Sequence, residues 1–241
     1  NRPQARNALT FAMYEGLAEI CGRAGQTREA KALVITGAGD KAFAAGTDIA
    51  QFQEFKGGED GIAYERKMDR VLDAIERCRV PTIAAIAGFC TGGGAAIAAV
   101  CDLRLATTDA QFGFPIARTL GNCLSMANYA RLAALIGPQR TKEVILLAKL
   151  IDGPTALGIG LVSELLPDVA TLRSRAEEVA RTVASHAPIT LQVTKEALRR
   201  LQARLGDDDI DDLIRLAYGS NDFREGMAAF LAKRAPKWSG T

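Results

Sequence analysis

The stretch Gly88–Asp102, GFCTGGGAAIAAVCD, decides the fold of this chain. Just before it, Thr82–Ala87 (TIAAIA) is an apolar run typical of a buried strand. Inside it, Gly92–Gly94 precede the small-residue run Ala95–Val100. We interpret this run as a helix packed closely on a neighbour, because alanine side chains let two backbones approach. The pattern therefore predicts a strand, a glycine turn and the N-terminus of a helix.

The three glycines of this turn allow two interpretations. Glycine adopts positive φ angles freely, and it leaves backbone N–H groups uncovered. At the N-terminus of a helix such groups favour negative charge, so they can stabilise charge that develops on a substrate oxygen. The alternative is that Gly92–Gly94 only make a tight turn beneath a closely packed helix.

The composition is that of an ordinary globular protein, with 241 residues, 48% of them hydrophobic and 24% charged. A net charge of +2 without a Lys/Arg block argues against nucleic-acid binding, and no apolar run is long enough for a membrane span. The five cysteines form no CxxC pair, so we expect reduced thiols and a cytoplasmic location. The single histidine, His186, excludes a multi-histidine metal site, and we expect no metal.

Strands and helices alternate over the first two thirds of the chain, and helices alone fill the rest. We expect strands at Ala32–Thr36, Thr82–Ala87, Leu103–Ala106 and near the end of Asp152–Pro167. The spacing of apolar residues predicts helices at Phe11–Arg23, Gly61–Arg77, Gly121–Ile136, Pro138–Leu150, Thr171–Ser185, Ile189–Leu205, Asp208–Tyr218 and Asp222–Arg234. This order predicts an α/β core followed by a helical C-terminal part.

Two turns follow two of the expected strands. Ala32–Thr36 leads to Ala45–Asp48, and Thr82–Ala87 leads to Gly92–Gly94. Two strand ends of one sheet can place two N–H groups around one oxygen. Such a pair stabilises an enolate or a tetrahedral oxyanion, and the loss of one donor typically costs about 2.7–4 kcal/mol of barrier.

A different class of enzyme is the alternative at the first of these turns. Gly37–Ala42 follows a strand and fits the loose dinucleotide pattern G-x-G-x-x-A. A long amphipathic helix should come next in a nucleotide-binding oxidoreductase, but Phe43–Gly46 (FAAG) comes instead. The pattern therefore favours the paired turns over a nucleotide site.

Several motifs resemble one family and keep its order from residue 1 to about residue 238. They are NRPQARNAL, ALVITGAGDKAFAAGTDI, VPTIAAIAGFCTGGGAAIAAVCDLRLAT, AQFGFP, ALGIGLVSELLP and EGMAAFLAKRAPKW. On these motifs the chain resembles the enoyl-CoA hydratase/isomerase family, also called the crotonase superfamily. The resemblance implies an α/β fold, a crotonase-like spiral of ββα repeats over residues 1–185. A helical region over residues 186–241 would form homotrimers or dimers of trimers. The family's first strand would precede Asn1.

The resemblance also implies a ligand and a site. The substrate would be an acyl-CoA thioester, so coenzyme A would enter as part of the substrate and no separate cofactor is expected. The thioester oxygen would be held by the backbone N–H groups of Thr47 and Gly93. The other positions expected to contact substrate are Ala45, Asp48, Ile49, Gly92, Ala96, Ile116, Asn122, Phe230 and Lys233.

The chain departs from the family where its hydratases carry two glutamates. Those positions hold Ala96 and Ile116, which cannot move a proton. Adding water to a double bond needs a positioned acid and base, so we expect poor hydration of crotonyl-CoA and a drier acyl pocket. The segment Arg118–Ser125, where isomerases of the family usually place a carboxylate, holds none.

Other groups could replace the missing acids only with help from neighbours. Cys123 or Ser125 would need an adjacent base to act as a nucleophile. We interpret Cys123 as a small buried residue, His186 as an ordinary surface or capping residue, and Asp48 as a carboxylate that orders its loop.

The sequence therefore predicts an enzyme of the enoyl-CoA hydratase/isomerase type, a lyase or isomerase that stabilises a thioester enolate without the hydratase glutamates. A decarboxylase of a malonyl-type CoA and an isomerase with an unusual acid or base stay open. So does a non-catalytic acyl-CoA binding protein.

Overall fold

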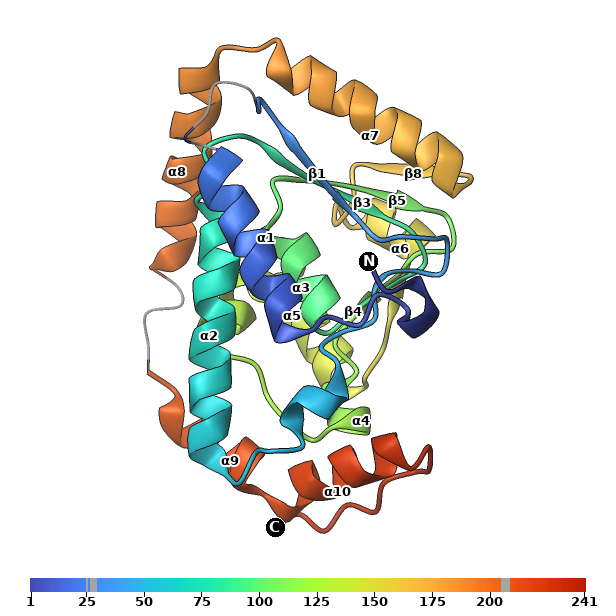
Figure 1. Cartoon of the computed structure of the whole chain (residues 1–241), viewed down its shortest axis with the longest axis vertical. Helices are drawn as coiled ribbons and strands as arrows, with labels where there is room; N and C mark the ends of the chain where they lie inside the picture. The colour runs from blue at the N-terminus through green and yellow to red at the C-terminus, as the bar shows by residue number, and fades with distance from the viewer. Residues whose placement is uncertain (25, 27–29, 205–208) are drawn as a thin grey trace.

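The computed structural model describes residues 1–24, 26, 30–204 and 209–241 (Figure 1). The C-terminal end of the helix expected at Ile189–Leu205 and the start of the one expected at Asp208–Tyr218 lie outside the described residues. Two four-stranded sheets form the centre of the described chain. No helix in these ranges is both long and apolar enough to cross a membrane.

The first sheet holds the strands that the sequence predicts. Its order is β1 (Leu33–Thr36), β3 (Thr82–Ile86), β5 (Leu103–Thr107) and β8 (Glu164–Leu166), and all neighbours are parallel. Every residue of β3 is buried, as expected for a central parallel strand that is covered on both faces.

The second sheet consists of strands of two or three residues. Its order is β2 (Ala42–Ala44), β4 (Phe89–Thr91), β6 (Gln111–Gly113) and β7 (Ile151–Asp152), with only β7 antiparallel. From β1 to β6 the chain gives one strand to each sheet in turn, as in the predicted spiral of ββα repeats, and β7 then adds to the second sheet before β8 returns to the first. The sequence analysis did not separate this sheet from turns, because such short strands show no alternation.

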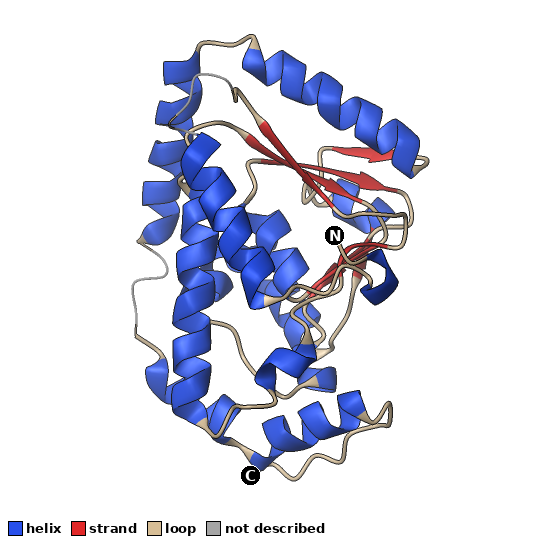
Figure 2. Ribbon diagram, viewed as in Figure 1, coloured by secondary structure: helices blue, strands red, loops and turns tan. Residues whose placement is uncertain are grey.

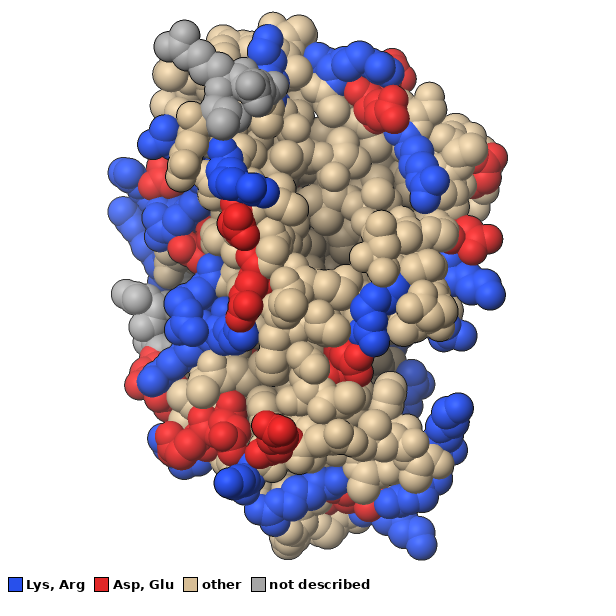
Figure 3. Space-filling model, in the orientation of Figure 1, with Lys and Arg blue, Asp and Glu red and all other residues tan. Residues whose placement is uncertain are grey.

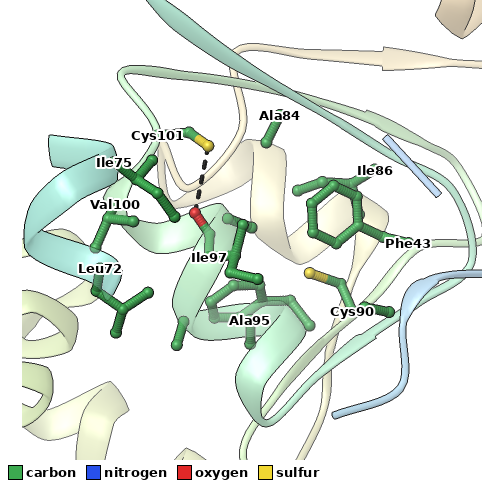
Figure 4. Packing of buried hydrophobic residues seen from close by; sticks show 14 of the residues in the cluster. Phe43, Leu72, Ile75, Ala84, Ile86, Cys90, Ala95, Ile97, Val100 and Cys101 are labelled. Atoms are coloured by element: carbon green, nitrogen blue, oxygen red, sulfur yellow. Dashed lines mark hydrogen bonds between the residues drawn. The ribbon is translucent and has the colours of Figure 1, made fainter. Parts of the chain in front are cut away.

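Helices cover both faces of the first sheet (Figure 2). On one face α7 (Val169–Ala184) places Leu172 and Ala176 against Ile83 and Ala85 of β3. On the other face lies the main core, in which α3 (Gly93–Val100) packs against α2 (Gly58–Glu76), behind α1 (Phe11–Ala24). Figure 4 shows Ala95 and Ile97 of α3 among side chains of both sheets and of α2.

The glycine turn lies one strand later than expected. β3 ends at Ile86, the short strand β4 follows, and only then does Gly92 lead into α3. The helix N-terminus therefore belongs to the edge of the second sheet. The close packing inferred from the alanines is present, because a Cβ atom on Gly94 would lie 2.3 Å from the carbonyl oxygen of Ala44.

The middle of the chain also differs from expectation. The helices expected at Gly121–Ile136 and Pro138–Leu150 are one kinked element, α5 (Met126–Leu146), which Gly137 breaks with φ 80°. Residues 121–125, just before α5, are not helical. The Ser125 side chain caps α5 by accepting a hydrogen bond from the N–H of Asn128. Shorter elements complete this region: 3-10 turns at Pro3–Ala5 and Ile49–Phe52, α4 (Ile116–Thr119) and α6 (Gly153–Gly158).

The C-terminal part is helical, as expected. It comprises α8 (Pro188–Ala203), α9 (Asp211–Gly219), which packs on α2, and α10 (Asn221–Leu231) at the lower end of Figure 1. Apolar side chains of α8 such as Ile189 and Val193 are exposed. Association into trimers would cover surfaces of this kind, and it stays a prediction. On the face drawn in Figure 3, acidic and basic side chains are interspersed near the edges, with a mainly uncharged centre.

Candidate active site

The two predicted turns meet because the strands before them are neighbours. β2 pairs in parallel with β4, with Ala44 opposite Cys90, so both strands end at the same edge. Gly46 (φ 104°) and Gly92 (φ 52°) make the turns in conformations that L side chains rarely adopt. A Cβ atom on Gly92 would lie 3.4 Å from the Cα atom of Gly46, which shows how closely the turns approach. We call Gly46–Thr47 and Gly92–Gly93 the oxyanion turns.

The backbone hydrogen bonds that hold each turn do not use the amide N–H groups of Thr47 and Gly93, so both groups can bind a ligand. Beside Thr47, Leu9 N donates to Gly46 O and Asp48 N donates to Leu9 O, both at 2.8 Å, so this bridge uses the neighbours of Thr47. Gly93 is the first residue of α3, where amide groups have no acceptor within the helix. Both groups therefore lie in turns that approach each other, which a two-donor site for an oxyanion requires.

Three hydroxyl groups gather at this site. The Thr47 Oγ1 atom lies 2.8 Å from the hydroxyl oxygens of both Tyr14 (α1) and Tyr64 (α2). The Tyr14 hydroxyl lies 1.8 Å from where a Cβ atom on Gly93 would be. Burial raises the pKa of Tyr14 and of Tyr64 well above the ordinary value, so both hydroxyls keep their protons. The sequence analysis missed both tyrosines, which come from helices without a motif.

One cavity of about 830 Å³ opens onto the oxyanion turns. The positions expected to hold the thioester oxygen or to contact substrate are all part of its wall: Ala45, Thr47, Asp48, Ile49, Gly92, Gly93, Ala96, Ile116, Asn122, Phe230 and Lys233. The fold thus brings together residues from both ends of the chain.

The two positions at which the resemblance implies glutamates are buried and apolar. Ala96 lies one helical turn beyond Gly93, and its N–H donates to Gly92 O at 2.9 Å. Ile116 begins α4. Met68 and Leu72 of α2 add further apolar surface to the same cavity. This part of the wall offers nothing that can position or deprotonate a water molecule.

One carboxyl group in the same cavity wall, that of Glu65, lies outside the motifs of the sequence. This α2 residue lines the cavity and is 3% exposed. Its Oε1 atom accepts from the Tyr218 hydroxyl at 2.6 Å, and its Oε2 atom accepts from Ser125 N at 3.0 Å. Asn122 Nδ2 donates to the Tyr218 oxygen at 3.1 Å. We call Glu65, Ser125, Tyr218 and Asn122 the Glu65 cluster.

The Glu65 cluster is a polar patch in apolar surroundings. Burial, together with the nearby charge of Asp69, raises the pKa of Glu65 to about 8, so its carboxyl carries a proton at neutral pH. Among the described residues, Asn122 Oδ1 is buried without a hydrogen-bond partner. The sequence alone could not assign Glu65 to the site, because a glutamate on an amphipathic helix is usually solvated.

The other candidates have structural surroundings. Asp48 accepts from Arg2 at 2.7 Å and from Ala50 N at 3.2 Å, as expected for a carboxylate that orders its loop. Burial raises the pKa of the Cys123 thiol to about 12, which makes it a poor nucleophile at neutral pH. Ser125 donates to Asp69 and lies outside the cavity wall, and His186 is exposed after α7.

Known proteins resemble this chain over its whole length. A sequence model of the enoyl-CoA hydratase/isomerase family matches residues 1–241. A short-chain-enoyl-CoA hydratase of Clostridium acetobutylicum is 34% identical, over 97% of this chain and 90% of the relative. A crotonyl-CoA hydratase of Syntrophomonas wolfei is 33% identical over the same shares.

Two solved structures share the fold. One is an enoyl-CoA hydratase/carnithine racemase from Magnetospirillum magneticum, with 32% identity and a TM-score of 0.79, covering 100% of this chain and 90% of that one. The other is a methylmalonyl-CoA decarboxylase in complex with 2-nitronate-propionyl-CoA, with 26% identity and a TM-score of 0.89. The match covers 100% of this chain and 93% of the decarboxylase.

Proposed function

The chain belongs to the enoyl-CoA hydratase/isomerase family of acyl-CoA enzymes, and we propose that it forms the enolate of a CoA thioester without adding water to a double bond. The observation that carries the proposal is the meeting of the oxyanion turns on a cavity where Ala96 and Ile116 are apolar. The Thr47 and Gly93 N–H groups would hold the thioester oxygen and stabilise it more strongly as it becomes an enolate oxygen.

Decarboxylation of a malonyl-type CoA fits these groups. The bond between the α-carbon and the substrate carboxylate breaks, CO₂ leaves, and the electron pair moves into the thioester to form the enolate. No protein base is needed for this step, because the leaving carboxylate supplies the electrons. A methylmalonyl-CoA decarboxylase is among the structures that share this fold, which supports decarboxylation as a reaction that the fold can host.

The rest of the cavity is suited to a thioester. Phe230 and Lys233 contribute to its wall from the C-terminal tail, and Ala45 and Ile49 contribute from the first oxyanion turn and the segment after it. A cationic side chain beside an apolar one suits the phosphates and the pantetheine of coenzyme A.

Turnover on matched thioesters tests the proposal. We expect release of CO₂ from malonyl-CoA or methylmalonyl-CoA, with acetyl-CoA or propionyl-CoA as the second product, and very slow hydration of crotonyl-CoA. Hydration of crotonyl-CoA at ordinary enzymatic rates, on the order of 10 per second, would contradict it. Tight binding of every thioester without any turnover would identify a non-catalytic acyl-CoA binding protein instead.

A further inference from the structure

The cavity wall contains two carboxyl groups in the part of the chain that the structure describes, and they differ in their partners. Asp48 is bound by the Arg2 guanidinium. The hydrogen-bond partners of Glu65 are Tyr218 and Ser125, both uncharged. Arg131 of α5, the nearest cation in this network, forms ion pairs with Asp69 and Glu76. Among the described residues, Glu65 is therefore a buried acid without an ion pair.

Three elements fix the position of this acid. Its own helix is α2, Tyr218 comes from α9, and Ser125 caps the N-terminus of α5. Each carboxyl oxygen accepts one hydrogen bond, so the group cannot rotate without losing both. An acid held in this way in the wall of a ligand cavity is a candidate for proton transfer to a bound ligand.

Helix α2 also reaches the oxyanion turns, through the residue before Glu65. Tyr64, the residue before it on α2, places its hydroxyl 2.8 Å from Thr47 Oγ1. The charge of Glu65 contributes to the raised pKa of Tyr14, whose hydroxyl lies against Gly93. The α2 helix thus supplies a carboxyl to the cavity wall on which α3 and α4 present Ala96 and Ile116.

We propose that Glu65 gives its proton to the α-carbon of the enolate that the oxyanion turns hold. This inference rests on the proposed function and adds its proton donor. As the enolate collapses to the thioester carbonyl, the new C–H bond forms at the α-carbon and the O–H bond of Glu65 breaks. The carboxylate that remains accepts the Tyr218 and Ser125 hydrogen bonds, and a proton from solvent restores the acid before the next turnover.

The charge of Glu65 raises the pKa of several neighbouring groups. They are Tyr14 on α1, Tyr64 on α2, Cys123 before α5, Tyr129 on α5 and Tyr218 on α9. The charge of Asp69 raises the pKa of Glu65, whereas the Tyr218 hydrogen bond lowers it. Burial has the largest effect and raises the pKa to about 8, which leaves the acid protonated at pH 7.

Hydrogen exchange of propionyl-CoA in D₂O tests the assignment without a decarboxylation step. By microscopic reversibility, ionised Glu65 should remove an α-proton and return a deuteron, so exchange should rise as the pH passes through about 8. The variant Glu65→Gln keeps the size and the hydrogen-bonding oxygen of the side chain. We expect it to lower the exchange rate by about 10²–10⁴-fold and to abolish that rise, while propionyl-CoA still binds.

Two further variants keep the test decisive if Glu65→Gln folds poorly. Asp69→Asn removes a nearby negative charge and should move the exchange midpoint to lower pH. Tyr218→Phe removes a donor to the carboxylate and should move the midpoint to higher pH. Midpoints that stay in place in both variants, or full exchange in Glu65→Gln, would overturn the assignment.

The outcome also separates this inference from the proposed function. If the wild-type protein decarboxylates malonyl-type thioesters but shows no exchange that depends on Glu65, then Glu65 is not the proton donor and the proposed function still holds. Wild-type protein with neither activity on any thioester would overturn the proposed function itself.

Discussion

The oxyanion turns and Glu65 line one cavity but are held in opposite ways. The turns would act through backbone N–H groups, and their glycines lie in two short motifs at the ends of paired strands. The Glu65 cluster uses side chains, and its strongest contact joins Glu65 to Tyr218, 153 residues away. Backbone chemistry is therefore tied to the fold, whereas the acid can come from any element that packs against the cavity.

Placing glutamates at the positions of Ala96 and Ile116 would most strongly test this difference between a site fixed by the backbone and an acid supplied by a side chain. In the double variant Ala96→Glu, Ile116→Glu, two carboxyl groups should face the thioester from α3 and α4. We expect crotonyl-CoA hydration to increase by about 10²–10⁴-fold, because an acid and a base then face the double bond. The measurement is the absorbance loss of the conjugated thioester.

The matched control is Ala96→Gln, Ile116→Gln, which adds the same bulk without an acid and should not hydrate. Equal hydration by wild type and by the glutamate variant would show that the missing acids do not limit this scaffold.

Stability should reveal the cost of keeping Glu65 buried. Its pKa is raised in the folded protein to about 8 from an ordinary 4.5, so the folded state binds this proton more tightly than the unfolded state. The stabilisation is complete below about pH 4.5 and is lost as the pH rises towards 8, at up to about 1.4 kcal/mol per pH unit. Glu65→Gln should therefore gain stability relative to wild type between pH 5 and pH 8.

Denaturant unfolding of both proteins at pH 5 and pH 8 measures this effect. A difference between the two proteins that does not grow with pH would mean that Glu65 ionises freely in the folded state.

A substitution in the C-terminal tail should have the smallest effect, a change in the affinity for CoA thioesters. Lys233 lines the cavity, so Lys233→Ala should raise the Kd for CoA thioesters by a few-fold and leave the oxyanion turns untouched. Lys237 lies outside the cavity wall, and Lys237→Ala is the matched control. Calorimetry with acetyl-CoA would measure both, and a parallel titration with NAD should show no binding.

The contrast between backbone turns and distant side chains also explains how much of the structure could be predicted from the sequence. The long strands, most helices and the oxyanion turns could be predicted, because apolar runs and glycines report local structure. The second sheet could not, since β2, β4 and β6 are three residues long. Tyr14, Tyr64 and Glu65 could not be assigned to the site, because only the packing of α1 and α2 beside the turns brings them there.

The central claim is that the N–H groups of the oxyanion turns hold the enolate. Proline suits the first position of a helix and removes the N–H of Gly93. Because any side chain at Gly93 would collide with the Tyr14 hydroxyl, both test proteins carry Tyr14→Phe. One adds Gly93→Pro, and the other adds Gly93→Ala, which brings a similar Cβ atom but keeps the donor.

The most direct measurement is the rate of α-proton exchange of propionyl-CoA in these two double variants, side by side at saturating thioester. We expect the proline protein to be slower than the alanine protein by about 10²–10³-fold, with similar melting temperatures. Equal exchange rates in the two proteins would contradict it, because the Gly93 N–H would then contribute nothing to the enolate.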